Sequence, residues 1–244
     1  MSWEGRSVVI LGGGNFGTRA LEFLKEKGSR IVVIDLYPEC KAQSFLDREV
    51  RDVMVLEQLG NGEAVFLKSD GVVEALKLLK NGIIPHMIVP AIPVHTTAIL
   101  VLETLKMEGL EVKPFEEKTR EVAIRIPEDL IITLDEKNAI IVTSFMQDPQ
   151  GCDPNCIPPP DHCSVTKRPR PVPMFDILRE ALNDQVDFGR VLESEQIGSG
   201  VGGYYGQDLY GILEDLKREK RKDFSIGIGT ACTCHGVVNF FKIS

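Results

Sequence analysis

The first half of the chain takes its fold from residues 7–17, which read SVVILGGGNFG. The short β-branched run at its start predicts a strand that is buried on both faces of a parallel sheet. After the glycines, apolar residues recur at helical spacing until Gly28, where the helix is expected to end. A second buried run, IVVI at 31–34, is followed by Asp35. Strand, G-x-G-x-x-G, helix, strand and acid together form the dinucleotide-binding pattern.

Each residue type in this pattern has a physical role. Gly12 permits a tight turn, Gly14 has no Cβ to obstruct a pyrophosphate, and Gly17 lets the helix pack close to the strand. The N–H groups and the dipole of the helix N-terminus attract phosphate. Asp35 stands where a carboxylate accepts hydrogen bonds from the adenosine ribose and repels a 2′-phosphate, which favours NAD over NADP. The alternative is a glycine-rich turn without a ligand. The residues expected to bind NAD are Gly12, Gly14, Asn15, Phe16, Gly17 and Asp35.

Strand-like and helix-like segments continue to alternate up to about residue 115. Repeated βα units imply an open parallel sheet with helices on both faces. The predicted fold class is therefore α/β, with a Rossmann-like dinucleotide-binding domain at residues 1–115. The further expected strands are 64–67, 86–89 and 110–112, and the further expected helices are 41–59, 72–80 and 97–107.

Residues 8–35, with 64–70 and 72–82 following, resemble the nucleotide-binding domain of potassium-uptake regulators of the TrkA-N type. They are similar, less closely, to the NAD-binding part of precorrin-2 dehydrogenases. The resemblance covers about the first 115 residues, and the glycine fingerprint is its specific part. It implies NAD or another adenine nucleotide at the matching glycines and acid. Since such regulators bind nucleotide without turning it over, the resemblance leaves catalysis open. We recognise no relative of the whole chain.

The second half, residues 116–244, is expected to form an α/β segment with cysteine-rich loops. The charged residues 116–120 predict a surface connection. Two runs, 130–134 and 139–145, predict a β-hairpin. Residues 190–228 suggest a strand, a glycine-rich loop, a helix and a second strand. A right-handed crossover would make those two strands parallel.

Five cysteines form two groups in this half. Cys152, Cys156 and Cys163 lie in a proline-rich stretch that suits neither a helix nor a central strand. Cys232 and Cys234 lie close to the C-terminus. The prolines lower the entropic cost of ordering the loop around a bound ion or cluster. The weaker candidate ligands are His162 and His235.

Three interpretations of these cysteines remain open. An iron–sulfur cluster typically needs four thiolates, which the first group and either Cys232 or Cys234 would supply. Structural zinc also takes four ligands, but Cys-x-Cys is a cramped second pair. The third interpretation is unliganded cysteines, some of them buried as small hydrophobic residues. Three cations follow the first group and would offset the charge of a thiolate-bound cluster, or else form a solvated loop. They are Lys167, Arg168 and Arg170.

Composition excludes several classes of protein. The chain has 28 basic and 36 acidic residues and a net charge of −8, which does not suit nucleic-acid binding. No apolar segment approaches the roughly 18 residues of a membrane helix. The first apolar run is also too short for a signal peptide, so a cytoplasmic protein with reduced cysteines is expected.

The leading hypothesis is an NAD-dependent oxidoreductase. Its nicotinamide would exchange a hydride with a small substrate or pass electrons through an iron–sulfur cluster. His95, which follows a predicted strand, is a candidate for proton transfer, although a lone histidine near a helix start is more often structural. The alternative is a nucleotide-sensing regulatory protein with a structural zinc site. The substrate or redox partner is not identified by the sequence, and a homodimer is expected by analogy.

Overall fold

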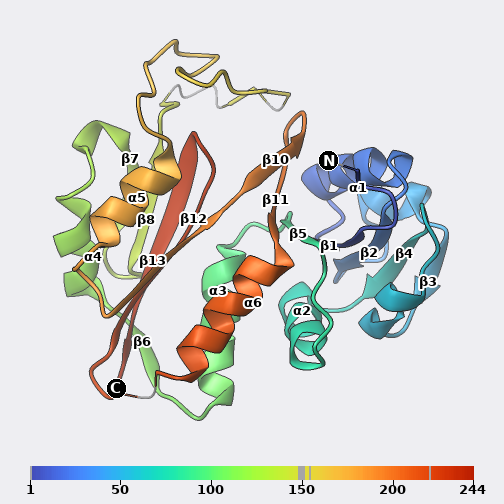
Figure 1. Cartoon of the computed structure of the whole chain (residues 1–244), viewed down its shortest axis with the longest axis horizontal. Helices are drawn as coiled ribbons and strands as arrows, with labels where there is room; N and C mark the ends of the chain where they lie inside the picture. The colour runs from blue at the N-terminus through green and yellow to red at the C-terminus, as the bar shows by residue number, and fades with distance from the viewer. Residues whose placement is uncertain (1, 148–151, 154, 220) are drawn as a thin grey trace. The chain divides into compact units, whose positions relative to one another are not determined.

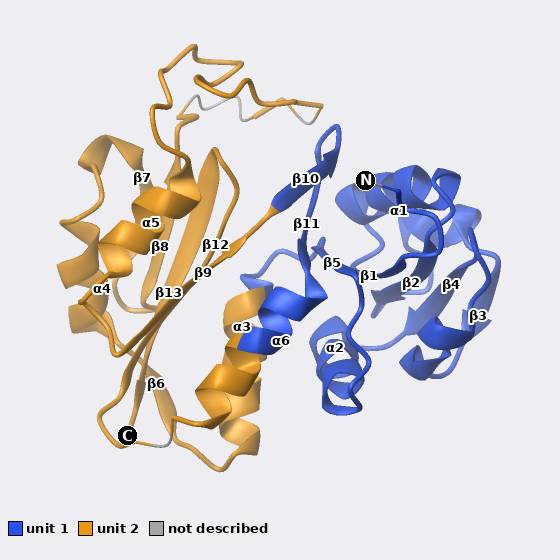
Figure 2. Cartoon of the chain, in the orientation of Figure 1, with its two compact units in different colours: residues 1–96, 195–211 blue, residues 97–194, 212–244 orange. Residues whose placement is uncertain are grey.

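The computed structural model describes residues 2–147, 152–153, 155–219 and 221–244 (Figure 1). The chain forms two compact units (Figure 2). Unit 1 contains residues 1–96 and 195–211, and unit 2 contains residues 97–194 and 212–244. The sequence predicts domains at residues 1–115 and 116–244. The two compact units do not test whether those parts fold independently, so this boundary stays a prediction.

Unit 1 is built on a seven-stranded sheet with the order β10-β11-β5-β1-β2-β4-β3. The order β4-β2-β1-β5, with these strands parallel, is typical of a doubly wound sheet. A hairpin from the second half of the chain, β10 (Glu195–Gly198) and β11 (Val201–Tyr205), pairs antiparallel with β5 and makes the sheet mixed. The parallel strands are β1 (Ser7–Leu11), β2 (Arg30–Asp35), β3 (Arg48–Val50), β4 (Ala64–Lys68) and β5 (Met87–Pro90).

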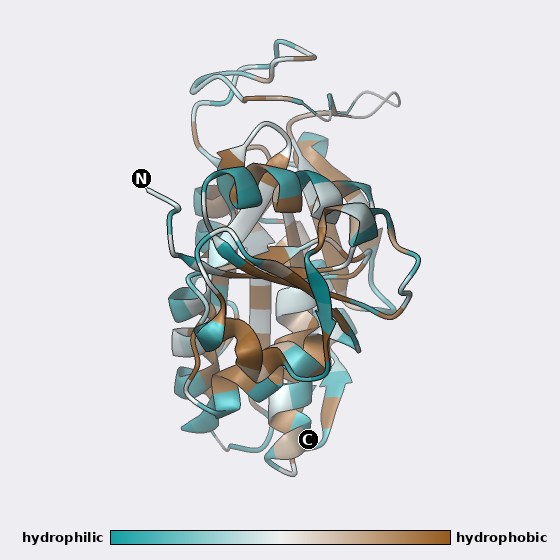
Figure 3. Cartoon of the chain, turned by 90° about the vertical axis from the view of Figure 1, so that its right-hand side faces the viewer, coloured by the Kyte–Doolittle hydropathy of each residue, from teal (hydrophilic) through white to brown (hydrophobic). Residues whose placement is uncertain are grey.

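The apolar runs of the sequence form the centre of this sheet. Val8, Val9, Ile10 and Leu11 of β1 are completely buried, and hydrophobic colouring follows the central strands in Figure 3. The helices α1 (Asn15–Glu26) and α2 (Gly71–Lys80) follow β1 and β4, as expected from the sequence. Burial on both faces explains why these strands read as continuous apolar runs.

The predicted helix at 41–59 is wrong. The segment forms two short 3-10 helices, η1 (Lys41–Phe45) and η2 (Val53–Gln58), on either side of β3. β3 then pairs in parallel with β4. A tertiary pairing has therefore overridden the helical spacing of the apolar residues.

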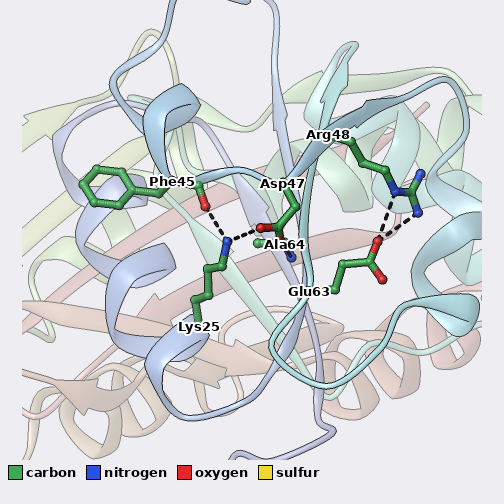
Figure 4. Close-up of polar contacts among 6 residues, drawn as sticks. All are labelled: Lys25, Phe45, Asp47, Arg48, Glu63 and Ala64. Carbon is green, nitrogen blue, oxygen red and sulfur yellow. Dashed lines mark hydrogen bonds and ion pairs between the residues drawn. The ribbon is translucent and has the colours of Figure 1, made fainter.

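Polar contacts hold the start of β3 in place (Figure 4). Asp47 accepts a hydrogen bond from the Ala64 N–H at 2.8 Å and pairs with the Lys25 ammonium at 2.7 Å. Its pKa is lowered because these two partners outweigh the opposing effect of burial. Arg48 pairs with Glu63 at 3.0 Å. The partners of the segment lie far along the chain, so its conformation is not encoded locally.

Unit 2 contains a six-stranded sheet in which β7, β8, β13, β12 and β9 follow one another and β6 pairs with β13. The expected hairpin is present as β7 and β8, and β9 and β12 are parallel, as the crossover predicted. The strand bounds are β6 (Val112–Pro114), β7 (Ile131–Asp135), β8 (Ile140–Ser144), β9 (Phe188–Glu193), β12 (Ser225–Ala231) and β13 (His235–Ile243).

Two expectations for this region are wrong. The strand expected at 110–112 is β6, which pairs with β13 instead of joining the parallel sheet. The charged stretch 116–120 belongs to α4 (Glu116–Ala123), because Val122 and Ala123 at its end pack into the core of unit 2. The remaining helices are α3 (Thr96–Met107), α5 (Met174–Leu182) and α6 (Gly206–Lys217). A short 3-10 turn, η3 (Glu128–Leu130), precedes β7.

The predicted α/β class is confirmed, with two mixed sheets. Among the helices that the structure describes, none combines the length and the apolar character needed to cross a bilayer.

Candidate functional site

The glycine loop of unit 1 begins where β1 ends, and two of its glycines shape the loop itself. Gly12 has a φ of +103°, and a Cβ there would lie 2.7 Å from the carbonyl oxygen of Ala91. A Cβ on Gly17 would lie 1.9 Å from the carbonyl oxygen of Gly12. Larger residues at either position would collide with backbone atoms, so the turn requires both glycines.

Gly14 is different, because no packing contact requires it. A Cβ there would meet no atom within 4 Å. Gly14 is the N-cap of α1, and it has no side chain with which to cap the first N–H groups of the helix. There is therefore room for a side chain at the residue that directly precedes α1.

Asp35 lies at the end of β2 and is bonded to the glycine loop. Its Oδ2 accepts a hydrogen bond from the Gly13 N–H at 2.6 Å, and its Oδ1 accepts one from the Tyr37 N–H at 2.9 Å. Each carboxylate oxygen retains a second lone pair for another donor. Cys40 packs here too, since a Cβ on Gly13 would lie 2.3 Å from its Sγ. Burial and the nearby Asp35 raise the pKa of the Cys40 thiol.

The neighbourhood of this loop combines exposed apolar side chains with a cation. Phe16, Leu36 and Tyr37 are 60%, 56% and 70% exposed. Lys41 donates a hydrogen bond to the Asn15 Oδ1 at 2.5 Å, which holds an ammonium group near the start of α1. The sequence interpretation included Asn15 and Phe16 but missed Leu36, Tyr37 and Lys41. The signal in the sequence was the apolar pair Leu36 and Tyr37, which directly follows Asp35 at the end of the predicted strand.

His95 lies between β5 and α3 and is half-buried. The segment that follows β5 touches the glycine loop at Gly12, through Ala91 and Ile92. His95 therefore belongs to a loop whose start lies beside the candidate nucleotide site. Its proposed role in proton transfer stays a prediction.

The fold brings the two cysteine groups of unit 2 together. Cys232 and Cys234 lie in the turn between β12 and β13. The N–H of Phe145 donates to the carbonyl oxygen of Cys234 at 3.0 Å, and the N–H of Met174 donates to that of Thr233 at 3.0 Å. Phe145 and Met174 flank the loop that carries the first cysteine group. Both ends of that loop are therefore bonded to the turn that carries the second group.

The thiols of the two groups influence one another. Partial desolvation and the nearby thiols of Cys156, Cys163 and Cys234 raise the pKa of Cys152 to about 11. Burial chiefly raises the pKa of Cys234 as well, with contributions from Cys232 and Cys156. The Cys156 Sγ also lies 2.9 Å from the hydroxyl oxygen of Ser164. The structure thus places all five cysteines in one neighbourhood, which we call the thiol centre.

Two of these thiols are held in surroundings that favour the thiolate. Burial acts to raise the pKa of Cys232, but His235 and backbone N–H groups outweigh it and the pKa is lowered. The Cys232 Sγ lies 3.7 Å from the His235 Nδ1 and 3.4 and 3.3 Å from the N atoms of Cys234 and His235. The pKa of Cys163 is lowered in the same way, against burial, by hydrogen bonds from Thr166 and by His235. His235 therefore influences both thiols.

The other histidine and the cations are arranged differently. The His162 Nδ1 lies 2.7 Å from Asp161 Oδ1, and Arg168 bonds to Asp129. Arg170 is only 3% exposed, and its guanidinium donates to the Cys234 Sγ at 2.6 Å and to the carbonyl oxygen of Pro159. The sequence left open whether Arg170 offsets the charge of thiolates or lies in a solvated loop. The structure buries its guanidinium against a thiol.

The thiol centre is not preformed around a metal ion. In the described structure, none of the six cysteines forms a disulfide bond. Within the described ranges, no three His, Cys, Asp or Glu side chains are close enough together to ligate one metal ion. The donor set nevertheless fits soft metals, because sulfur ligands select iron–sulfur clusters and zinc. Ligation would require the thiols to turn toward one point.

Comparison with known proteins assigns the chain to a family. Residues 8–96 match the N-terminal domain of AF_1314, and residues 97–244 match its C-terminal domain, each described as belonging to an uncharacterized protein. The chain belongs to the AF_1314 family. An uncharacterized protein of Archaeoglobus fulgidus is 35% identical over 236 residues, which cover 96% of this chain and 98% of that protein.

Membership of the AF_1314 family corrects the resemblance drawn from the sequence. The likeness to TrkA-N regulators and precorrin-2 dehydrogenases is wrong as a family assignment, because the matches over both halves indicate neither family. The sequence alone suggested no relative of the whole chain, whereas the family matches extend over residues 8–244. The resemblance rested on a glycine fingerprint, which records the geometry of a strand, a tight turn and a helix and does not identify a family.

Proposed function

We propose that the protein binds NAD(H) at the glycine loop of unit 1 and is an oxidoreductase. The nicotinamide would be coupled to a thiolate-bound iron–sulfur cluster at the thiol centre or to a small substrate. The observation that carries the proposal is the open space at Gly14. Its neighbours Gly12 and Gly17 are needed by the turn, whereas Gly14 leaves room in front of a helix N-terminus.

Charge and hydrogen-bonding capacity at this place suit a diphosphate. The first N–H groups of α1 and the helix dipole attract an anion. No acidic residue occurs in the first turn of α1, and Lys41 lies beside Asn15. A pyrophosphate would therefore meet donors and a cation without a repelling carboxylate in that turn.

The surroundings of Asp35 suit the adenosine half of the ligand. The free lone pairs of its carboxylate can accept hydrogen bonds from ribose hydroxyls, and its charge opposes a 2′-phosphate. Leu36 and Tyr37 follow directly and are exposed, so they offer an apolar surface to a base. These features favour NAD over NADP.

The thiol centre supports the redox part of the proposal. When bound, the nicotinamide supplies hydride transfer and an iron–sulfur cluster supplies one-electron chemistry. The residues of the chain hold and orient these groups: backbone N–H groups and Asp35 in unit 1, and thiols with Arg170 in unit 2. This division of tasks requires no acid–base triad.

Isothermal titration calorimetry with NAD⁺, NADH, NADP⁺ and NADPH tests the nucleotide site. Because a Cβ at Gly14 meets nothing, a Gly14→Val variant is expected to fold normally and to bind NADH at least tenfold more weakly, or about 1.4 kcal/mol. Gly211→Ala is the matched control, since a Cβ there also meets no atom within 4 Å. Absence of binding heat with every dinucleotide, or equal affinity in the Gly14 variant, would contradict the proposal.

A further inference from the structure

We propose that Cys152, Cys156, Cys163 and Cys234 bind one metal centre of net negative charge, for which Arg170 is the buried counter-charge. The inference deepens the redox function proposed above, but it depends on unit 2 alone and holds whether or not unit 1 binds nucleotide.

The first step is the state of Arg170. A guanidinium remains protonated in proteins, so its burial brings a full positive charge out of water. Such a charge is costly unless a nearby anion compensates it. The Nη1 of Arg170 is in direct contact with the Cys234 Sγ, at 2.6 Å, so the guanidinium is directed at this sulfur atom. A neutral thiol is a weak acceptor, whereas a thiolate is a strong one.

The second step is the lack of another anion for this charge. Among the residues that the structure describes, no carboxylate forms an ion pair with Arg170 within 4.0 Å. Arg170 contributes, after His162, to lowering the pKa of Asp161. The Asp161 side chain is nevertheless 80% exposed, and it pairs with His162. The anion that compensates Arg170 is therefore expected to come from the thiols.

The third step is the total charge of the centre. Four thiolates on a divalent metal ion leave two negative charges, whereas two thiolates with two neutral imidazoles leave none. Iron–sulfur clusters held by four thiolates likewise carry negative charge. A buried guanidinium suits the anionic centres and opposes the neutral one. The pairing of His162 with Asp161 agrees, because it directs that imidazole to a carboxylate.

The fourth step assigns the ligands. Cys234 is the thiol that Arg170 contacts, and it lies near Cys156 and Cys232. Cys232 has partners of its own, since its Sγ faces the His235 ring and the N–H groups of Cys234 and His235. The sequence left Cys232 and Cys234 as equal candidates for the fourth ligand. The position of Arg170 favours Cys234.

The test uses full-length protein purified without oxygen, after reconstitution with ferrous iron and sulfide or, separately, with zinc. Metal and acid-labile sulfide are measured, and X-ray absorption gives the ligands. A shell of sulfur alone, near the 2.3 Å typical of metal–thiolate bonds, is expected. A shell that includes nitrogen, or a protein that retains neither metal, would overturn the proposal. Zinc without iron would support the anionic centre and remove the iron–sulfur part of the proposed function.

Matched variants test the assignment. Cys234→Ser is expected to lose the metal, while Cys232→Ser keeps it; the reverse result would overturn the ligand set. Arg170→Met is expected to weaken zinc binding at least tenfold in competition with a chelator and to raise the melting temperature of metal-free protein, since it removes an uncompensated buried charge. Arg168→Met should do neither. An unchanged zinc affinity in the Arg170 variant would overturn its role as counter-charge.

Discussion

The glycine loop and the thiol centre are constructed in opposite ways. In the glycine loop, Gly12 and Gly17 lie against backbone oxygen atoms, and Asp35 is bonded to the Gly13 N–H without any ligand. In the thiol centre, the ends of the loop are tied to the β12–β13 turn, but the thiols do not converge on one point. The first region is organised by its own packing, whereas for the second we propose that a ligand completes it.

This difference teaches that the two regions should respond differently to perturbation. Substitutions that disturb packing should damage the glycine loop, whereas removal of the ligand should damage the thiol centre. The experiments below separate these responses, beginning with the largest expected effect.

Metal removal is expected to have the largest effect. A ligand at a thousandfold excess over its Kd stabilises a protein by about 4 kcal/mol, so chelation should lower the melting temperature by roughly 10 °C. Hydrogen exchange should then increase in α5 and in the turn of residues 232–234, while α1 keeps its protection. If amide protection in α1 fell equally, metal removal would destabilise both regions, and the predicted difference between them would be wrong.

Gly17→Ala should disturb the glycine loop without any change of ligand. Its Cβ would lie 1.9 Å from a backbone oxygen, and overpacking of this kind costs about 3 kcal/mol. Gly14→Ala is the control, with an expected change within about 0.5 kcal/mol. Urea unfolding of the two variants measures the difference. Similar stabilities would mean that the loop is less tightly packed than described.

Alkylation of metal-free protein by iodoacetamide sharpens the contrast within the thiol centre. The thiolate is the reacting form, and the pKa is lowered at Cys232 but raised to about 11 at Cys152. The rate at Cys152 should therefore keep rising toward pH 11, whereas the rate at Cys232 should level off below the ordinary thiol pKa of 9.0. Mass spectrometry at each pH resolves the two sites. A rate at Cys232 that keeps rising as far as the rate at Cys152 would contradict these directions.

The smallest expected effect is at the edge of the glycine loop. Lys41→Met removes a cation that is exposed to solvent, so NADH binding should weaken by about 0.7 kcal/mol, or roughly threefold, and the difference should shrink as salt is added. Lys27→Met, at the far end of α1, is the matched control. A loss that does not depend on salt would point to a structural role for Lys41.

The sequence predicted the parts of the fold that depend on local patterns. The strands at 7–11, 31–34 and 64–67 were correct because continuous apolar runs are typical of buried parallel strands. β3 was missed because it depends on contacts of Asp47 with Lys25 and Ala64. The return of β11 to unit 1 was missed because it pairs with β5, more than a hundred residues away.

The same distinction applies to the candidate sites. The two cysteine groups lie near each other because the proline-rich loop is tied to the turn of residues 232–234, and their role as metal ligands stays a prediction. The burial of Arg170 could not be predicted, because Lys167 and Arg168 look equivalent in sequence and only the folded loop separates them.

An amide NMR titration with NADH tests the central claim most directly, because it reports both regions in one experiment. The account predicts that the N–H signals of residues 13–17 and 36–37 shift with saturation, while those of the 232–235 turn and the 198–203 hairpin do not. Saturating shifts confined to another part of the chain, or no shift at the glycine loop at millimolar NADH, would contradict it.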